Sequence, residues 1–302
     1  PIKSSAASDV YKRQALVYLL VSTVINIILD LLFVAKFGMG VNGVALATVI
    51  AQAVSAILCL IRLSKMKDLF DLNRKYLKWN GKYGKNIIRL GVPSGLTQAI
   101  FSMAMIIVQS LTNSFGEMFI AANVIVMRVD GFAMLPNFSF GTAMTTYSGQ
   151  NIGAAKNDRV TKGAKQGTLI AVLTTTFITS LILIFGRQLM GIFTATTELV
   201  DLSRRMMGII AAGYIAMAVT QSLSGVMRGA GDTMTPMWIS LFTTIVVRVP
   251  VAYGIAHFTK SATFPNGRQE CVFISLLCSW LIGAIMTTIF YLRGKWKNKA
   301  LR

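Results

Sequence analysis

The chain has 302 residues, of which 54% are hydrophobic, and its 30 lysines and arginines against 11 acidic residues give a formal net charge of +19. Uncharged apolar runs of about 20 residues recur along it, each long enough to cross a hydrocarbon core of roughly 30 Å. These properties exclude a water-soluble globular protein and predict an all-α polytopic membrane protein.

Residues 1–14, PIKSSAASDVYKRQ, precede the first apolar run and contain neither an initiator Met nor an apolar signal core. The stretch resembles translated adaptor sequence, so we expect it to be an artefactual leader that takes no part in the fold. On this interpretation the natural protein begins further upstream, and the chain is a fragment.

Eight membrane spans are predicted after the leader. They lie at residues 15–36, 41–61, 88–112, 118–147, 166–186, 206–227, 234–257 and 271–292. The first two form one region, 15–61. A charged segment, 62–87, follows and is expected to include a helix on the membrane surface. The other six spans and a basic tail make up the region 88–302.

Lysine and arginine are concentrated in alternate connections between the spans. The segments 62–89, 156–165 and 293–302 are strongly basic, whereas the intervening loops carry few positive charges. This asymmetry predicts a multi-pass protein of the plasma membrane with both ends of the chain in the cytoplasm. The positive charge then faces anionic lipid headgroups, and nucleic acid is not an expected partner.

Asp30 lies inside the first span, in the stretch NIILDLLF. On a helix it shares a face with Asn26, and Thr48 and Gln52 form a second polar stripe in the next span. The two stripes can meet across an antiparallel hairpin. A carboxylate among neutral oxygens can bind a small cation or a proton in a dry bundle. The alternative is a hydrogen-bond network that only holds the hairpin together.

Three further charges lie at or towards membrane depth, at Arg128, Asp130 and Arg248. Because Arg128 and Asp130 are only two residues apart, they do not face each other on a helix. Asp130 is expected to find a partner on another helix, and Arg248 is one candidate. Such a pair would lock the region 88–302 together; alternatively, these residues line a substrate cavity.

Several motifs resemble those of the multidrug and toxic compound extrusion (MATE) family. Besides the NxxxD span, they are FGMGVNGVALAT, LGVPSGLTQ, AANVIVMRVDGFAMLP, SGQNIGAAKNDR and GVMRGAGDTMTP. The resemblance covers the chain from Ala15 to about residue 293. It implies a MOP-type bundle of twelve spans in two lobes, of which this chain has the last two spans of the first lobe and the complete second lobe.

The resemblance also implies secondary active efflux of cationic, amphipathic drugs or toxins, in exchange for H⁺ or Na⁺, by alternating access between the lobes. In the DinF-like branch, the coupling site combines an upstream Asp with positions that match Asn26, Asp30 and Thr48. Other branches place acids where this chain has apolar or hydroxyl side chains, near Phe101 and Met217. This departure favours coupling at Asp30, with a proton as the first choice. No cofactor is expected, and the full-length protein is expected to be monomeric.

Two other functions stay open at this point. The first is a flippase for lipid-linked precursors or polysaccharides from the same superfamily, which the cations Arg128 and Arg248 favour. The second is a non-transporting or truncated membrane protein. An enzyme is not expected, because the three cysteines and the single histidine lack the spacing of a metal site or a catalytic group.

Overall fold

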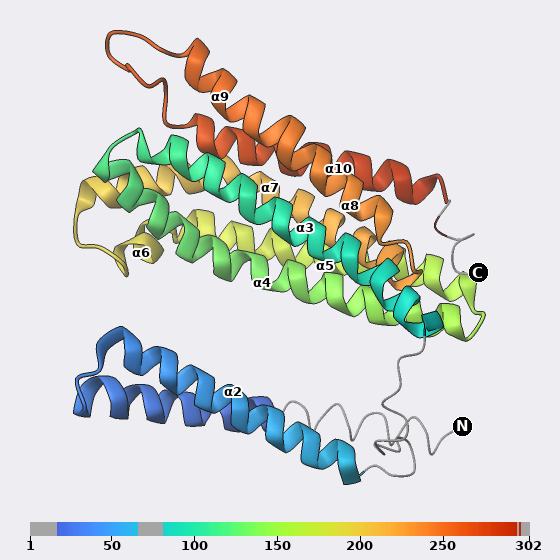
Figure 1. Ribbon diagram of the computed structural model, residues 1–302. Helices are drawn as coiled ribbons and strands as arrows, with labels where there is room; N and C mark the ends of the chain where they lie inside the picture. The colour runs from blue at the N-terminus through green and yellow to red at the C-terminus, as the bar shows by residue number, and fades with distance from the viewer. Residues whose placement is uncertain (1–16, 66–80, 295, 297–302) are drawn as a thin grey trace. The chain divides into compact units, whose positions relative to one another are not determined.

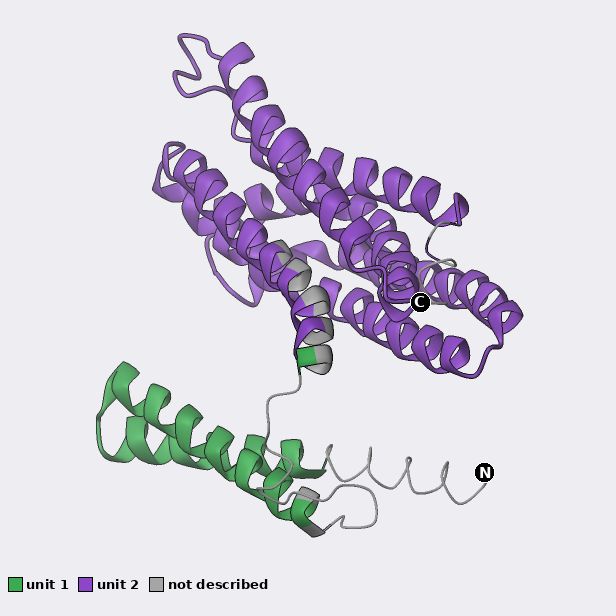
Figure 2. Ribbon diagram, turned by 45° about the vertical axis from the view of Figure 1, so that its right-hand side comes forward, with its two compact units in different colours: residues 1–81 green, residues 82–302 purple. Residues whose placement is uncertain are grey.

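The computed structural model describes residues 17–65, 81–294 and 296, and every regular element in them is a helix. The chain divides at Gly81 into two compact units, residues 1–81 and 82–302 (Figure 2). The division falls within the segment expected to link two lobes, 62–87. The leader 1–14 and the surface helix expected in the linker lie outside the described residues.

Unit 1–81 contains a helical hairpin. Its first arm, Val17–Lys36, is α-helical at first and ends as the π-helix η1 (Leu31–Lys36). The chain then turns through Gly38 and Gly40, whose φ angles of 63° and 54° lie in the left-handed region that glycine adopts without a steric penalty. The second arm is α2 (Gly40–Lys65).

Unit 82–302 is a bundle around one central helix, α7 (Thr197–Gly229). The other elements are α3 (Gly81–Asn113), α4 (Glu117–Gly153), α5 (Asn157–Ile184), α6 (Gly186–Gly191), α8 (Met234–Leu241), η3 (Phe242–Arg248), α9 (Val249–Phe258) and α10 (Cys271–Leu292). Helix α7 packs against α4, α5, α6 and α10 (Figure 1). Its long run of buried residues includes Met206, Ile210 and Tyr214, which belong to the main hydrophobic core.

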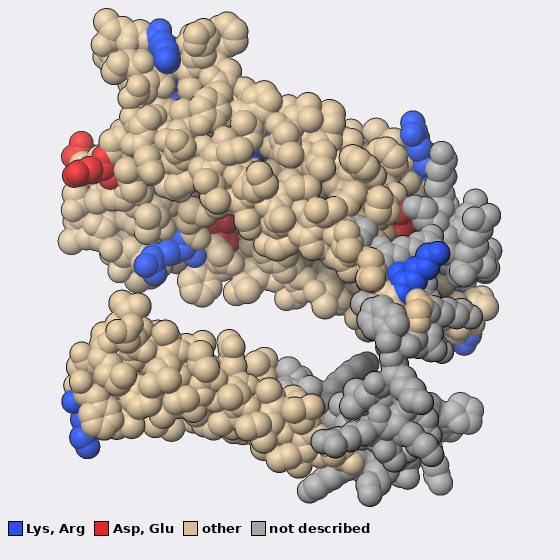
Figure 3. Space-filling view, in the orientation of Figure 1, with Lys and Arg blue, Asp and Glu red and all other residues tan. Residues whose placement is uncertain are grey.

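Seven helical stretches of the described residues are long and apolar enough to cross a membrane. They correspond to seven of the eight expected spans, and the remaining one, 88–112, lies within α3. Figure 3 shows few charged side chains across the middle of the visible face of unit 82–302. This distribution suits a surface against lipid, where an exposed charge is costly. The predicted all-α polytopic membrane fold is confirmed.

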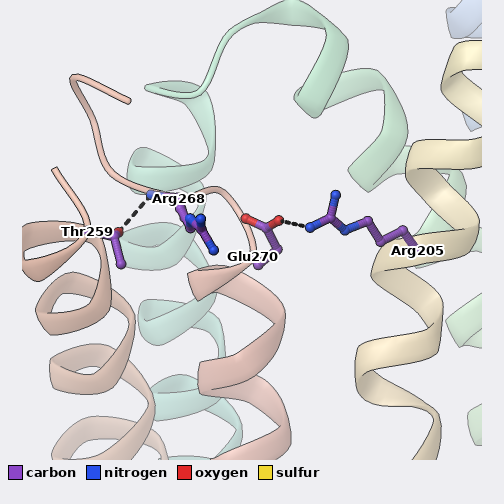
Figure 4. A network of polar contacts seen from close by, with 4 residues as sticks. All are labelled: Arg205, Thr259, Arg268 and Glu270. Carbon is purple, nitrogen blue, oxygen red and sulfur yellow. Dashed lines mark hydrogen bonds and ion pairs between the residues drawn. The ribbon is translucent and has the colours of Figure 1, made fainter. Parts of the chain in front are cut away.

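Polar contacts tie elements together at the end of the bundle where α7 and α10 begin (Figure 4). Arg205 Nη2 on α7 donates to Glu270 Oε1, directly before α10, at 2.7 Å. The backbone N–H of Arg268 donates to Thr259 Oγ1, directly after α9, at 2.8 Å. The first contact holds the connection between α9 and α10 against α7, and the second joins the two ends of that connection.

Helices α4 and α7 approach each other closely at two glycines of α7, Gly225 and Gly229. A Cβ atom at Gly225 would collide with the carbonyl oxygen of Gly141, and one at Gly229 with the carbonyl oxygen of Thr145. Small residues four positions apart are a common means of bringing membrane helices into backbone contact. This contact fixes the position of α4, which carries Asp130, relative to α7.

Candidate functional site

The hairpin of unit 1–81 is joined along a seam of small residues on α2. Ala47 and Ala51 are fully buried, and a Cβ at Gly43 would lie only 3.0 Å from the Cβ atoms of Met39 and Phe33. Ser22 Oγ crosses the seam and donates to the carbonyl oxygen of Ala51 at 2.8 Å. Close packing of this kind fixes the register between the two arms.

This register brings two of the predicted site residues together. Asn26 Nδ2 donates to Thr48 Oγ1 at 3.4 Å, and Thr48 Oγ1 in turn donates to the carbonyl oxygen of Val44 at 2.9 Å. The first distance is longer than the usual 2.7–3.2 Å of an N–H···O bond. The polar stripes therefore meet across the hairpin, through a loose contact that a small shift of either helix would change.

Asp30 lies one turn further along the face that carries Asn26. The residue is half-buried, and its Oδ1 atom is buried without a hydrogen-bond partner. The π-helix η1 begins at the next residue, and π-helical turns are frequent at functional sites. A buried, unsatisfied carboxylate oxygen costs about 1–3 kcal/mol or more. A neutral carboxyl group or a bound cation would lower this cost.

Two other residues that the sequence predicts as site residues are Gln52 and Arg128. Gln52 is exposed on α2, and Arg128 is exposed on α4. Among the described side chains, neither forms a hydrogen bond with Asp30 or Asp130. A role for Gln52 or Arg128 in a cavity or a charge network therefore stays a prediction.

A cavity of about 620 Å³ lies inside unit 82–302, between α3, α4, α7, η3 and α10. Its wall is mainly apolar, with methionines and aromatic rings such as Met105 and Trp280. Both Asp130 and Arg248 line it. A volume of this size is typical of sites for organic molecules, which lie at about 300–1,000 Å³.

The partner of Asp130 is Tyr214, which sequence reasoning did not find. Tyr214 OH donates to Asp130 Oδ1 at 2.9 Å, and its ring packs against Trp280 with centroids 5.6 Å apart. Asn137 Nδ2 donates to the carbonyl oxygen of Tyr214 at 3.3 Å and accepts at Oδ1 from Thr175 Oγ1 at 2.8 Å. This polar chain joins α4, α7 and α5.

Arg248 is 7% exposed, and Asp130 does not form an ion pair with it. Its Nη1 donates to Met105 Sδ at 3.6 Å, and its Nε has no hydrogen-bond partner. The two residues still attract each other electrostatically, because both face the same cavity. They line the cavity together without a direct contact.

Replacement of Tyr214 by phenylalanine tests how much the hydrogen bond from Tyr214 to Asp130 contributes to stability. Tyr214→Phe keeps the ring packed against Trp280 but removes the hydroxyl that donates to the half-buried carboxylate of Asp130. We expect the free energy of unfolding, measured in detergent by denaturant-induced unfolding, to fall by about 1–3 kcal/mol.

Tyr253→Phe is the matched control, because the exposed Tyr253 OH donates only to the carbonyl oxygen of Ile107 at 3.2 Å. This change should cost less than about 1 kcal/mol. Equal losses in the two variants would show that the hydroxyl of Tyr214 does not stabilise Asp130.

The chain is similar to several known proteins. A family model described as MatE matches residues 93–254. A Bacillus subtilis protein named "Probable multidrug resistance protein YoeA" is 31% identical over 249 residues, which are 80% of this chain and 54% of that protein. A Thermotoga maritima protein named "Probable multidrug resistance protein NorM" is 25% identical over 283 residues, 92% of this chain and 59% of that one.

A solved structure has the same arrangement of helices. It is described as the outward-facing conformation of a multidrug resistance MATE family transporter of the MOP superfamily, and it matches with a TM-score of 0.83 at 21% identity. The match covers 95% of this chain and 63% of that one. The chain therefore spans somewhat more than half the length of the relatives that it matches.

Proposed function

The chain belongs to the MATE family of transporters, and from this membership we propose that it forms part of a secondary active efflux transporter for drugs or toxins. Export is driven by inward movement of H⁺ or Na⁺, with alternating access between two lobes. One observation carries the proposal: a membrane hairpin holds a carboxylate oxygen, Asp30 Oδ1, buried and without a hydrogen-bond partner.

Coupling takes place at the cluster Asn26, Asp30 and Thr48. Protonation of Asp30 removes a buried charge, and binding of Na⁺ neutralises that charge with help from the amide and hydroxyl oxygens. Either event favours a different packing of the hairpin, and the loose Asn26–Thr48 contact allows the helices to shift. A proton is our first choice of coupling ion. The carboxylate of Asp30 has only Asn26 and Thr48 beside it in the cluster, and these offer few ligands for Na⁺.

The substrate is an organic, amphipathic cation. The transporter works as a monomer in the plasma membrane, with both ends of this chain in the cytoplasm, lipids around it and no cofactor other than the coupling ion. Nucleic acid is not a partner. The positive-inside distribution of lysine and arginine supports this orientation.

A flippase for lipid-linked precursors is the second candidate. One observation favours it: the cavity of unit 82–302 contains the buried cation Arg248, which suits an anionic ligand. The third candidate is a non-transporting membrane protein. We expect this chain, when it is expressed alone, not to transport.

Transport by reconstituted full-length protein tests the proposal. Proteoliposomes loaded with ethidium, a cationic dye, should release it when a proton or Na⁺ gradient is imposed and retain it without a gradient. Dye release that does not depend on either gradient would contradict ion-coupled efflux. Translocation of a lipid-linked phosphate without dye release would favour the flippase.

A change at Thr48 tests the role of its hydroxyl in coupling. Thr48→Val keeps the shape of the side chain but removes the acceptor of the Asn26 bond. We expect the ion concentration for half-maximal efflux to rise about fivefold, the equivalent of one hydrogen bond of about 1 kcal/mol.

Thr23→Val is the matched control, because the exposed Thr23 hydroxyl bonds only to the carbonyl oxygen of Leu19, on its own helix. It should leave the half-maximal concentration unchanged. If Thr23→Val has the same effect as Thr48→Val, the hydroxyl of Thr48 has no specific place in the coupling site.

A further inference from the structure

We propose that the cavity of unit 82–302 binds the carboxylate of an amphipathic organic anion, with Arg248 as its anchor. The inference goes beyond ion-coupled export of cations. It is also independent of coupling at Asp30, because the cavity lies wholly within unit 82–302 and Asp30 lies in the other unit.

The first argument is the unused donor capacity of Arg248. A guanidinium has five N–H donors and no acceptor. Here one nitrogen, Nη1, faces a weak acceptor, the thioether of Met105, and Nε has no partner. A cation that is 93% buried without a paired anion is unfavourable, and an anionic ligand in the cavity would remove this penalty.

The second argument is that Asp130, although it attracts Arg248 across the cavity, does not contact the guanidinium directly. The carboxylate of Asp130 accepts the hydroxyl of Tyr214 and makes no ion pair with Arg248. Among the described residues that line the cavity, the charged ones are Asp130, Arg228 and Arg248. The wall therefore carries one more positive than negative charge, which favours an anion.

The third argument concerns the rest of the ligand. The cavity of about 620 Å³ accommodates an organic molecule, and Phe101, Met105, Phe138 and Trp280 give it an apolar wall for a hydrocarbon or aromatic body. The planar fork of a guanidinium matches the two oxygens of a carboxylate. A carboxylate attached to an apolar body satisfies both parts of the site.

The fourth argument is the local backbone geometry at Arg248. Arg248 is the last residue of the π-helix η3, and Ser279 Oγ on α10 donates to the carbonyl oxygen of Thr243 within η3 at 3.0 Å. Such turns occur frequently at functional sites, because they change the direction in which side chains project. The turn is held in place by a neighbouring helix, so the position of Arg248 is defined before a ligand binds.

Binding of two fluorescent probes to the purified 302-residue chain in detergent tests the proposal. Dansylglycine carries a carboxylate, whereas dansylamide has the same fluorophore without it, so partition into micelles is closely matched. Energy transfer from tryptophan, including Trp280 in the cavity wall, reports binding. We expect dansylglycine to bind saturably and at least tenfold more tightly than dansylamide.

Variants at two arginines assign this preference to the cavity. Arg248→Gln should abolish it, whereas Arg187→Gln, which removes an exposed arginine paired with Asp201 at 3.8 Å, should preserve it. If Arg248→Gln does not fold, Arg248→Lys keeps the charge without the planar fork and should lose most of the preference. Equal binding of the two probes, or an unchanged preference in the folded Arg248 variant, would overturn the proposal.

A third probe distinguishes the source of the anion. A fluorescent phosphatidic acid presents a lipid phosphate in place of an organic carboxylate. If this lipid binds in an Arg248-dependent manner and dansylglycine does not, the carboxylate proposal is wrong and the flippase gains support. Weaker, Arg248-independent binding of the lipid would support the carboxylate site.

Discussion

Replacement of Asp30 by asparagine is expected to abolish ion-coupled efflux by the full-length transporter while leaving its insertion into the membrane intact. Asparagine has nearly the same shape but cannot take up a proton or neutralise a cation, so the hairpin would no longer respond to the gradient. Gradient-driven dye efflux in proteoliposomes should fall to the level of empty vesicles. The amount of folded protein should not fall, because the change removes a charge from a buried oxygen that has no partner.

Asp201→Asn provides the control for this experiment. Asp201 is an exposed aspartate at 3.8 Å from Arg187, and exposed ion pairs contribute little to stability or activity. It should transport at the rate of the unchanged protein. If Asp30→Asn retains full gradient-driven efflux, the coupling ion binds elsewhere.

Replacement of Gly225 by alanine is expected to destabilise the contact between α4 and α7. The new Cβ would collide with the carbonyl oxygen of Gly141, on α4, and backbone atoms cannot move aside as a flexible side chain can. Overpacking of this kind costs about 1–3 kcal/mol. A fall in the melting temperature in detergent, followed by size-exclusion chromatography after heating, measures it.

Gly208→Ala is the matched control on the same helix. A Cβ at Gly208 would meet nothing within 4 Å, and alanine favours a helix over glycine by up to about 1 kcal/mol. Its melting temperature should therefore stay the same or rise. If both variants behave alike, the approach of α4 to α7 is less tight than the structure indicates.

Much of the fold could be predicted from the sequence, because a membrane span needs a long apolar run and such runs are visible in the residues themselves. The ends of the helices are harder to predict from the sequence than their existence. Helix α4 continues to Gly153, beyond the predicted end of the span at residue 147, because hydropathy marks the apolar part of a helix and not its last turns. The π-helices η1 and η3 were not predicted, since they depend on hydrogen-bond register and not on hydropathy.

The two sites differ in how much of them the sequence could predict. Asn26 and Thr48 meet because a short turn makes the two helices neighbours and the close packing of small residues on α2 fixes their register. Tyr214 lies 84 positions from Asp130, and its contact follows from the packing of α4 on α7. The spacing of residues along the chain does not contain that information. Helical periodicity therefore found the local cluster and missed the long-range one.

Infrared difference spectroscopy of the full-length transporter tests most directly whether Asp30 exchanges its charge state. Spectra are compared between acidic and alkaline conditions, and with and without Na⁺, in the unchanged protein and in Asp30→Asn. The account predicts a carboxyl signal that changes with pH or Na⁺ in the unchanged protein and is missing in the variant. Identical difference spectra in the two proteins would show that Asp30 gains neither a proton nor a cation, and would contradict the account.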